Sequence, residues 1–145
     1  MISIRPIQAS DEPAWKMLWT GYLEFYETSV SPDVYETTFS RLLSDGPYEP
    51  KGFLAFSGEA AVGLVHYLPH RHCWRRQNVC YLQDLFAVPE ARGQGVGRAL
   101  IDAVYKEADR QGLGAVYWLT AEDNRTARIL YDQIASKTPF IKYQR

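Results

Sequence analysis

A glycine-rich hexapeptide is the segment of this sequence best suited to binding chemistry. It reads Arg92-Gly93-Gln94-Gly95-Val96-Gly97, between an apolar stretch at 79–88 and an amphipathic stretch at 98–111. Glycine adopts positive φ angles and lets a bulky group approach the backbone, and the free N–H groups and dipole of a helix N-terminus favour negative charge. A strand, a glycine turn and a helix start in this order predict a site for a phosphorylated ligand. Arg92 and Arg98 flank the turn and can add charge-assisted contacts, or they can be solvated arginines at a helix start.

A second segment carries side chains of metal-ligand type. His70, His72 and Cys73 lie close together and Cys80 follows, but they lack the paired spacing of a zinc site, so we expect no metal. The stretch 71–76 also holds three arginines and Trp74, which suits RNA or an acidic partner. A solvated connection between strands is the simpler interpretation.

The first half of the chain alternates helix and strand signals. Residues 2–6 alternate as a strand, and Ser10, two acids and Pro13 then mark a helix start. The following stretch has an aromatic-rich apolar face at helical spacing. A second helix is predicted over 34–43, and a hairpin joins strands at 53–57 and 61–68.

The second half begins with the longest predicted strand, at 79–88. It is followed by a helix at 98–111, a strand at 115–120, a helix at 124–134 and a closing strand at 139–143. The order strand, helix, helix, three strands, helix, strand, helix, strand predicts a mixed α/β domain with an antiparallel meander that leads into a crossover.

Composition narrows the choice of partners. The 145 residues are 46% hydrophobic and carry a net charge of −1, which predicts one domain over residues 1–145 without a basic field for nucleic acid or an anionic membrane. The N-terminus lacks the long apolar region of a signal peptide, so we expect a cytoplasmic protein. Two cysteines are too few for a disulfide framework, and both are expected to be reduced.

Two motifs in order resemble those of the GCN5-related N-acetyltransferase (GNAT) superfamily, over essentially the whole chain. Residues 92–97 match the superfamily's Q/R-x-x-G-x-G/A pyrophosphate loop, and Asn124 to Tyr131 match its N-x-x-A-x-x-x-Y segment. The P-loop Lys-Ser/Thr pair is absent, as is an acidic residue at the Rossmann distance. The resemblance implies the GNAT fold, in which the fourth and fifth strands splay apart.

The same resemblance implies acetyl-CoA as the donor. Backbone N–H groups of Gln94, Gly95, Gly97 and their neighbours Gly93 and Val96 would hold the pyrophosphate. The pantetheine arm would pair with the strand backbone at 85–88, where Phe86, Ala87 and Val88 matter by position more than by side chain. Ala127, Tyr131 and Asn124 would line the cofactor from the following helix, with Asn124 equally suited to capping that helix.

Tyr131 is the predicted catalytic residue. Amine acetylation needs a proton for the departing thiolate, and a phenol with a pKa of about 10 is protonated at neutral pH. In similar enzymes the tyrosine at this motif position supplies that proton. The alternative is a helix tyrosine packed against the sheet.

The catalytic base is less evident. Similar acetyltransferases often carry Glu or Asp where this chain has Gln83, and an amide does not accept a proton. Asp84 replaces position 83 only if a β-bulge re-aims it, because adjacent strand residues face opposite sides. A proton relay through water to Glu24, Asp84 or His66 is one route, and entry of a neutral amine is another.

The acceptor is expected between the first two helices and the far end of the 79–88 strand. Acidic and aromatic residues that suit a cationic amine gather there, with an ordinary solvated helix face as the alternative. The predicted acceptor-binding residues are Tyr22, Glu24, Tyr26, Gln83, Asp84 and Trp118.

These observations predict an acetyl-CoA-dependent N-acetyltransferase that acts on a primary amine of a small molecule, such as a polyamine, diamine or amino acid. One alternative is a lysine side chain of a protein or peptide. Another is a coenzyme A-binding regulatory protein without turnover, which the Gln83 substitution leaves open. By resemblance we also expect a homodimer, formed through the terminal strand region and the 69–78 connection.

Overall fold

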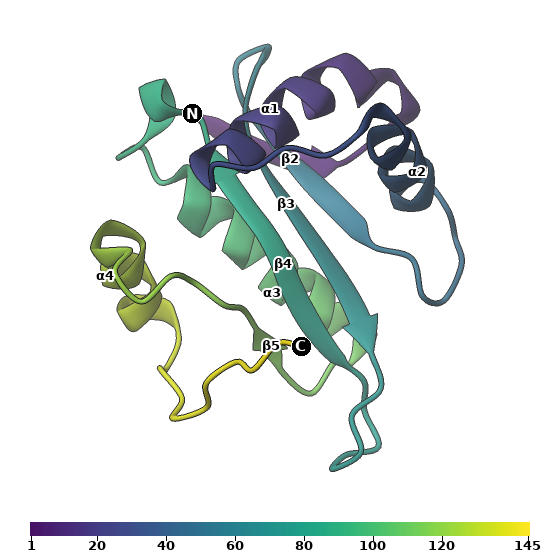
Figure 1. Cartoon of the computed structure of the whole chain (residues 1–145), viewed down its shortest axis with the longest axis vertical. Coiled ribbons are helices and arrows are strands. Elements are labelled where there is room, and N and C mark those ends of the chain that lie inside the picture. The colour runs from purple at the N-terminus through teal and green to yellow at the C-terminus, as the bar shows by residue number, and fades with distance from the viewer.

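A computed structural model describes all 145 residues. The chain folds into a five-stranded sheet with helices on both faces (Figure 1). The strands run in the order β1-β2-β3-β4-β5, and all neighbours are antiparallel except β4 and β5, which are parallel. The elements are β1 (Ile2–Pro6), α1 (Glu12–Phe25), α2 (Pro32–Leu42), β2 (Lys51–Ser57), β3 (Ala60–His70), β4 (Val79–Ala87), α3 (Val96–Gln111), β5 (Val116–Tyr117) and α4 (Arg125–Ile134), with short 3₁₀ helices at Ala9–Asp11 and Pro89–Ala91.

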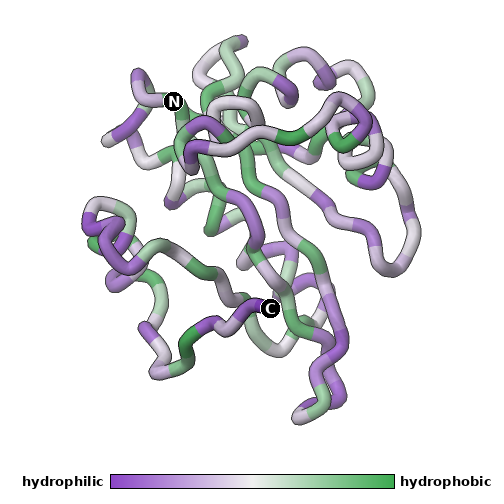
Figure 2. The backbone as a smooth tube through the Cα atoms, viewed as in Figure 1, coloured by the Kyte–Doolittle hydropathy of each residue, from purple (hydrophilic) through white to green (hydrophobic).

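Two hydrophobic clusters cover the two faces of the sheet. One joins α1 and α2 to the sheet through Trp15, Leu18, Leu54 and Leu64, and the other joins α3 to the sheet. The α3 side is formed by buried residues that include Val65, Leu82, Leu100, Ile101 and Val104. Figure 2 shows the hydrophobic residues concentrated along the central strands, and the projecting β3–β4 connection largely hydrophilic. The predicted α/β meander and crossover are therefore confirmed.

The fifth strand is shorter than its sequence predicts. Strand pairing was expected over 115–120, but β4 and β5 pair only at Cys80 with Val116 and at Tyr81 with Tyr117. A β-bulge in β4 lies directly beyond that second pair, and bulges bend a strand and strengthen its local twist. From Leu82 to Ala87 the outer edge of β4 consequently has no neighbouring strand.

The closing strand predicted at 139–143 does not form in this chain. Residues after Ala135 belong to no helix or strand, and Phe140, Ile141 and Tyr143 are exposed. A strand needs a partner edge to satisfy its backbone groups, and β5 offers only two residues while Pro139 has no N–H to donate. The prediction was wrong for the isolated chain because strand residue types do not supply a pairing edge.

Candidate active site

The glycine turn between β4 and α3 presents a set of free backbone donors. Gly93 and Gly95 have φ angles of 81° and 80°, in the left-handed region that favours glycine, and nothing lies within 4 Å of where a side chain would start at either one. The N–H groups of Gly95, Val96, Gly97 and Arg98 donate to no acceptor in the chain, whereas that of Gln94 donates to the carbonyl of Ala91 at 3.3 Å. Open space above free N–H groups at a helix start suits a phosphate.

The two arginines of this turn lie differently. Arg92 donates from Nε to the carbonyl oxygen of Ala87 at 3.3 Å, and its guanidinium lies 5.5 Å from the ring centre of Phe25. Arg98 is exposed in the first turn of α3. Both stay near the free N–H groups, so both remain candidates for phosphate contact.

The end of β4 nearest the glycine turn exposes main-chain groups, rather than side chains, to a ligand. The N–H of Val88 donates to Val62 on β3, so the main-chain groups of the adjacent Ala87 point to the open edge. The ring of Phe86 is buried against α1, and a Cβ at Gly21 would lie 2.8 Å from it. An extended ligand arm along this edge would therefore meet main-chain atoms.

The bulge in β4 is centred on Gln83. His66 pairs with Asp84 and Tyr67 pairs with Leu82, so Gln83 is the additional residue on β4. Before the bulge the even-numbered Leu82 faces α3, and after it the odd-numbered Leu85 does. Asp84 is thereby turned to the α1 face, which is the rearrangement that the sequence left open.

Asp84 belongs to a buried polar cluster that sequence reasoning missed as a unit. Its Oδ2 lies 2.8 Å from Nδ1 of His66 and accepts a bond from Nε1 of Trp19 at 3.3 Å. Trp15 donates from Nε1 to Nε2 of His66 at 2.9 Å. All four side chains are buried. The available signal was the pair of tryptophans four residues apart on one helix face. When the pairing of the strands is unknown, such a pair indicates only a hydrophobic core.

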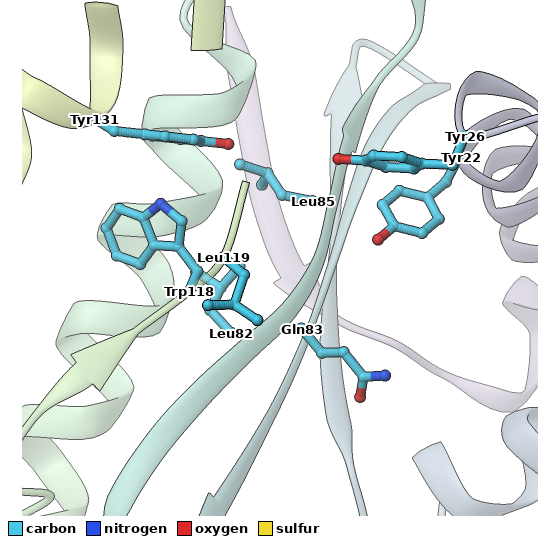
Figure 3. Close-up of a pocket in the computed structure, with 8 residues that line it drawn as sticks. All are labelled: Tyr22, Tyr26, Leu82, Gln83, Leu85, Trp118, Leu119 and Tyr131. Carbon is cyan, nitrogen blue, oxygen red and sulfur yellow. The ribbon is translucent and has the colours of Figure 1, made fainter. Parts of the chain in front are cut away.

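A small pocket lies between α1 and α4, beside the bulge (Figure 3). Its lining combines residues of α1 and the position directly after it, of β4, of α4 and of the segment after β5. These are Tyr22, Tyr26, Leu82, Gln83, Leu85, Trp118, Leu119 and Tyr131. Figure 3 shows the hydroxyl of Tyr131 directed from α4 toward Tyr22 and Tyr26, with Leu85 between the two sides.

Tyr131 is half-buried and protonated. Burial, and to a smaller extent the nearby Tyr26, raises the pKa of Tyr131 to about 12. Its ring packs edge-on against Trp118 at 5.3 Å between ring centres, and no hydrogen bond inside the chain uses its hydroxyl. The hydroxyl is therefore free to donate into the pocket.

Known proteins identify the scaffold. Residues 13–135 match the model of the Acetyltransferase (GNAT) family. The chain belongs to this family. It is 42% identical to the D-amino-acid N-acetyltransferase HPA3 of Saccharomyces cerevisiae over 99% of this chain and 90% of that protein. It is also 29% identical to the thialysine N-epsilon-acetyltransferase of Bos taurus over 71% of this chain and 56% of that protein.

A solved structure agrees with this assignment at the level of the fold. The acetyltransferase superposes with a TM-score of 0.86 and 17% identity on AAC(6')-Iy in complex with the bisubstrate analogue CoA-S-monomethyl-acetylneamine, covering 100% of this chain and 97% of that one. The superposition confirms the expected GNAT fold, and the family match with the relative at 42% identity confirms the expected enzyme class.

Several predicted site residues lie outside the pocket of this GNAT acetyltransferase. Glu24 is exposed on α1 and does not line it. Asn124 caps α4, with its side-chain oxygen accepting the N–H of Ala127 at 3.3 Å. The cap therefore accounts for that oxygen of Asn124, and Ala127 supplies the bonded N–H.

The histidine and cysteine side chains considered as metal ligands in the sequence do not line this pocket. His70 bonds to the hydroxyl of Tyr117 at 2.8 Å, and no group of three or more His, Cys, Asp or Glu side chains is placed to hold a metal ion. None of the helices is both long enough and apolar enough to cross a bilayer.

Proposed function

We propose that this enzyme transfers the acetyl group of acetyl-CoA to the primary amine of a small molecule, with Tyr131 as general acid. The observation that carries the proposal is the free, protonated hydroxyl of Tyr131, directed into a pocket that adjoins the unpaired edge of β4. The relatives named for D-amino acids and thialysine support an amine of low molecular weight.

The residues of this chain fit the donor. The N–H groups of Gly95, Val96, Gly97 and Arg98 would bind the pyrophosphate, and the main-chain groups of Leu85 and Ala87 would pair with the pantetheine arm. When bound there, acetyl-CoA supplies the acetyl group as a reactive thioester. Tyr131 would then face the thioester, because its side chain lies across the pocket from Leu85 at this edge.

The transfer follows from this arrangement. The amine nitrogen bonds to the thioester carbonyl carbon, the carbon–sulfur bond breaks, and the hydroxyl of Tyr131 gives its proton to the sulfur. The proton released by the amine leaves through water, and Tyr131 regains its own proton from solvent. Tyr22 and Tyr26 border the side from which the amine would approach, and Asp84, which the bulge turns to the α1 face, is buried between the lining residues Gln83 and Leu85.

Release of free thiol from acetyl-CoA tests the proposal. Purified enzyme is assayed with polyamines, diamines, D- and L-amino acids, aminoglycosides and a lysine peptide. We expect turnover with a small amine, and a loss of about 100- to 10,000-fold in kcat for Tyr131→Phe with unchanged coenzyme A binding. Tyr48→Phe is the control, because Tyr48 is 86% exposed and far in sequence from the site. Turnover of the lysine peptide alone would favour a protein substrate, and full activity in Tyr131→Phe would refute its role.

We also propose that residues 1–145 act as one cytoplasmic acetyltransferase domain that forms a homodimer. The exposed side chains of Phe140, Ile141 and Tyr143, on a segment with strand-like composition and no partner in its own chain, support pairing with a second copy. Light scattering after gel filtration tests this, with removal of residues 137–145 expected to give monomers.

A further inference from the structure

We propose that Tyr105 of α3 is a positioning residue for the reaction, because its hydrogen bond to the last residue of α4 holds Tyr131 at the pocket. This inference rests on the proposed function, since Tyr105 would act on the reaction only through Tyr131. It starts from the weak attachment of α4 to the rest of the molecule.

Helix α4 carries the proposed general acid but has little burial of its own. None of its residues is buried, whereas α1, α2 and α3 each contain at least two buried residues. In Figure 1 it lies at the edge of the molecule, with an extended segment on either side. A side chain that must donate a proton needs a firmer support, since a displacement of about 1 Å can cost a hundredfold in rate.

The hydroxyl of Tyr105 supplies this support. It donates to the carbonyl oxygen of Ile134, the last residue of α4, at 2.8 Å. No backbone N–H donates to that carbonyl, because the chain becomes extended at Ala135. The other hydrogen bonds of α4 are internal or reach back no further than Glu122. The bond from Tyr105 is thus the only hydrogen bond that joins residues 125–145 to an earlier element of the fold.

The side of α4 that Tyr105 holds is the side that carries Tyr131. Ile134 follows Tyr131 by three residues, so the two lie on one face of the helix, and both pack against the α3 cluster. The indole of Trp118 packs against both tyrosines, with 6.3 Å between its centre and that of Tyr105 and 5.3 Å to that of Tyr131. Figure 3 shows this indole beneath the Tyr131 ring. Release of Ile134 would therefore loosen the packing around the acid.

Helix α3 also begins at the proposed donor site, so one helix supports both reacting partners. A Cβ at Gly97, in the first turn of α3, would lie 3.6 Å from Cδ2 of Leu130 on α4. Tyr105 contacts α4 again about two turns further along α3. These two contacts set α4 relative to the glycine turn, and Tyr105 provides the one that is a hydrogen bond.

Tyr105→Phe tests the proposal, because it keeps the ring and removes only the hydroxyl. We expect kcat with a small amine to fall about 5- to 30-fold, while the KM for acetyl-CoA stays within about twofold. In an enzyme that already carries Tyr131→Phe, the same change should cost less than about twofold, because residues that act through one another are not additive. An unchanged kcat, or an equal loss in both backgrounds, would overturn the proposal.

Tyr35→Phe is the matched control for stability. Tyr35 is also half-buried, and its hydroxyl forms one hydrogen bond, at 2.7 Å to the hydroxyl of Thr20, in the cluster on the opposite face of the sheet. Both changes should lower the urea midpoint to a similar extent, but only Tyr105→Phe should lower kcat. An equal loss of kcat in Tyr35→Phe would show a general effect of destabilisation and would overturn the proposal.

Amide hydrogen exchange measures the attachment of α4 without turnover. In Tyr105→Phe the amides at 129–135 should exchange about 3- to 10-fold faster, as the loss of one hydrogen bond predicts, and those at 100–104 of α3 should change less than twofold. Unchanged exchange in α4 would overturn the proposal. Faster exchange in α4 combined with full activity of Tyr131→Phe would retain the anchoring role of Tyr105 and count against the proposed function.

Discussion

The donor half and the acceptor half that we propose for this site are built from different parts of the chain. The donor half, formed by the glycine turn and the open edge of β4, presents backbone groups to solvent and needs few particular side chains. The acceptor half depends on buried side chains from α1, β3 and β4 that contact one another across the core. The first is defined by local conformation, and the second by long-range packing.

Trp15→Phe should have the largest effect on folding, because it acts on the packed half. The change leaves Nε2 of His66 without a donor and removes ring volume from a residue that is 1% exposed. We expect the free energy of unfolding to fall by about 2–4 kcal/mol, measured by urea denaturation at pH 8. An equal loss in Trp74→Phe, at a residue that is 85% exposed, would show that the effect is not specific to the cluster.

Gly95→Ala should affect the donor half with a smaller cost to the fold. Its φ of 80° strains any residue with a side chain by about 1–2 kcal/mol, and relaxation of the turn would misalign the free N–H groups. We expect the KM for acetyl-CoA to rise about 5- to 30-fold. Gly58→Ala is a matched control, because Gly58 has a φ of 62° and equally open surroundings in the β2–β3 hairpin. Its KM should not change.

Phe86→Leu should separate the packing of β4 side chains in the core from the proposed binding of the donor by the β4 backbone. The ring packs in the α1 core, so its replacement should cost less than about 1.5 kcal/mol of stability. The KM for acetyl-CoA should stay unchanged, since the backbone at this position keeps its conformation. A raised KM with normal stability would mean that the side chain itself contacts the donor.

The smallest expected effect is that of alkaline pH on Tyr131. Its raised pKa of about 12 keeps the hydroxyl protonated, so the acid form is present below that value and is lost only as the pH rises through it. Between pH 8 and 10, kcat should therefore show no decline attributable to Tyr131. A decline with a midpoint below pH 10 that disappears in Tyr131→Phe would contradict this assignment.

The sequence predicted the two halves unequally well. The turn at 92–97 was predictable because glycine spacing, a preceding strand and a following helix specify its conformation locally. From the sequence, Asp84 replaces position 83 only if β4 contains a bulge. Whether that bulge forms depends on the register between β3 and β4, which adjacent residues do not reveal. The contact of Trp15 with His66 spans 51 residues, and nothing in either segment predicts it. The closing strand failed for a related reason, since its residue types suit a strand whose partner this chain does not supply.

The unpaired edge of β4 also links binding of the donor to the stability of the folded enzyme. From Leu82 to Ala87 the strand satisfies its backbone on one side only, so a bound pantetheine arm would act as the missing neighbour. Any ligand that binds the native state alone adds RT ln(1 + [L]/Kd) to stability, about 2.7 kcal/mol at a hundredfold excess over Kd. Amide hydrogens along this edge should accordingly exchange more slowly as coenzyme A is added. The folded lifetime of the enzyme would then follow the supply of its own donor.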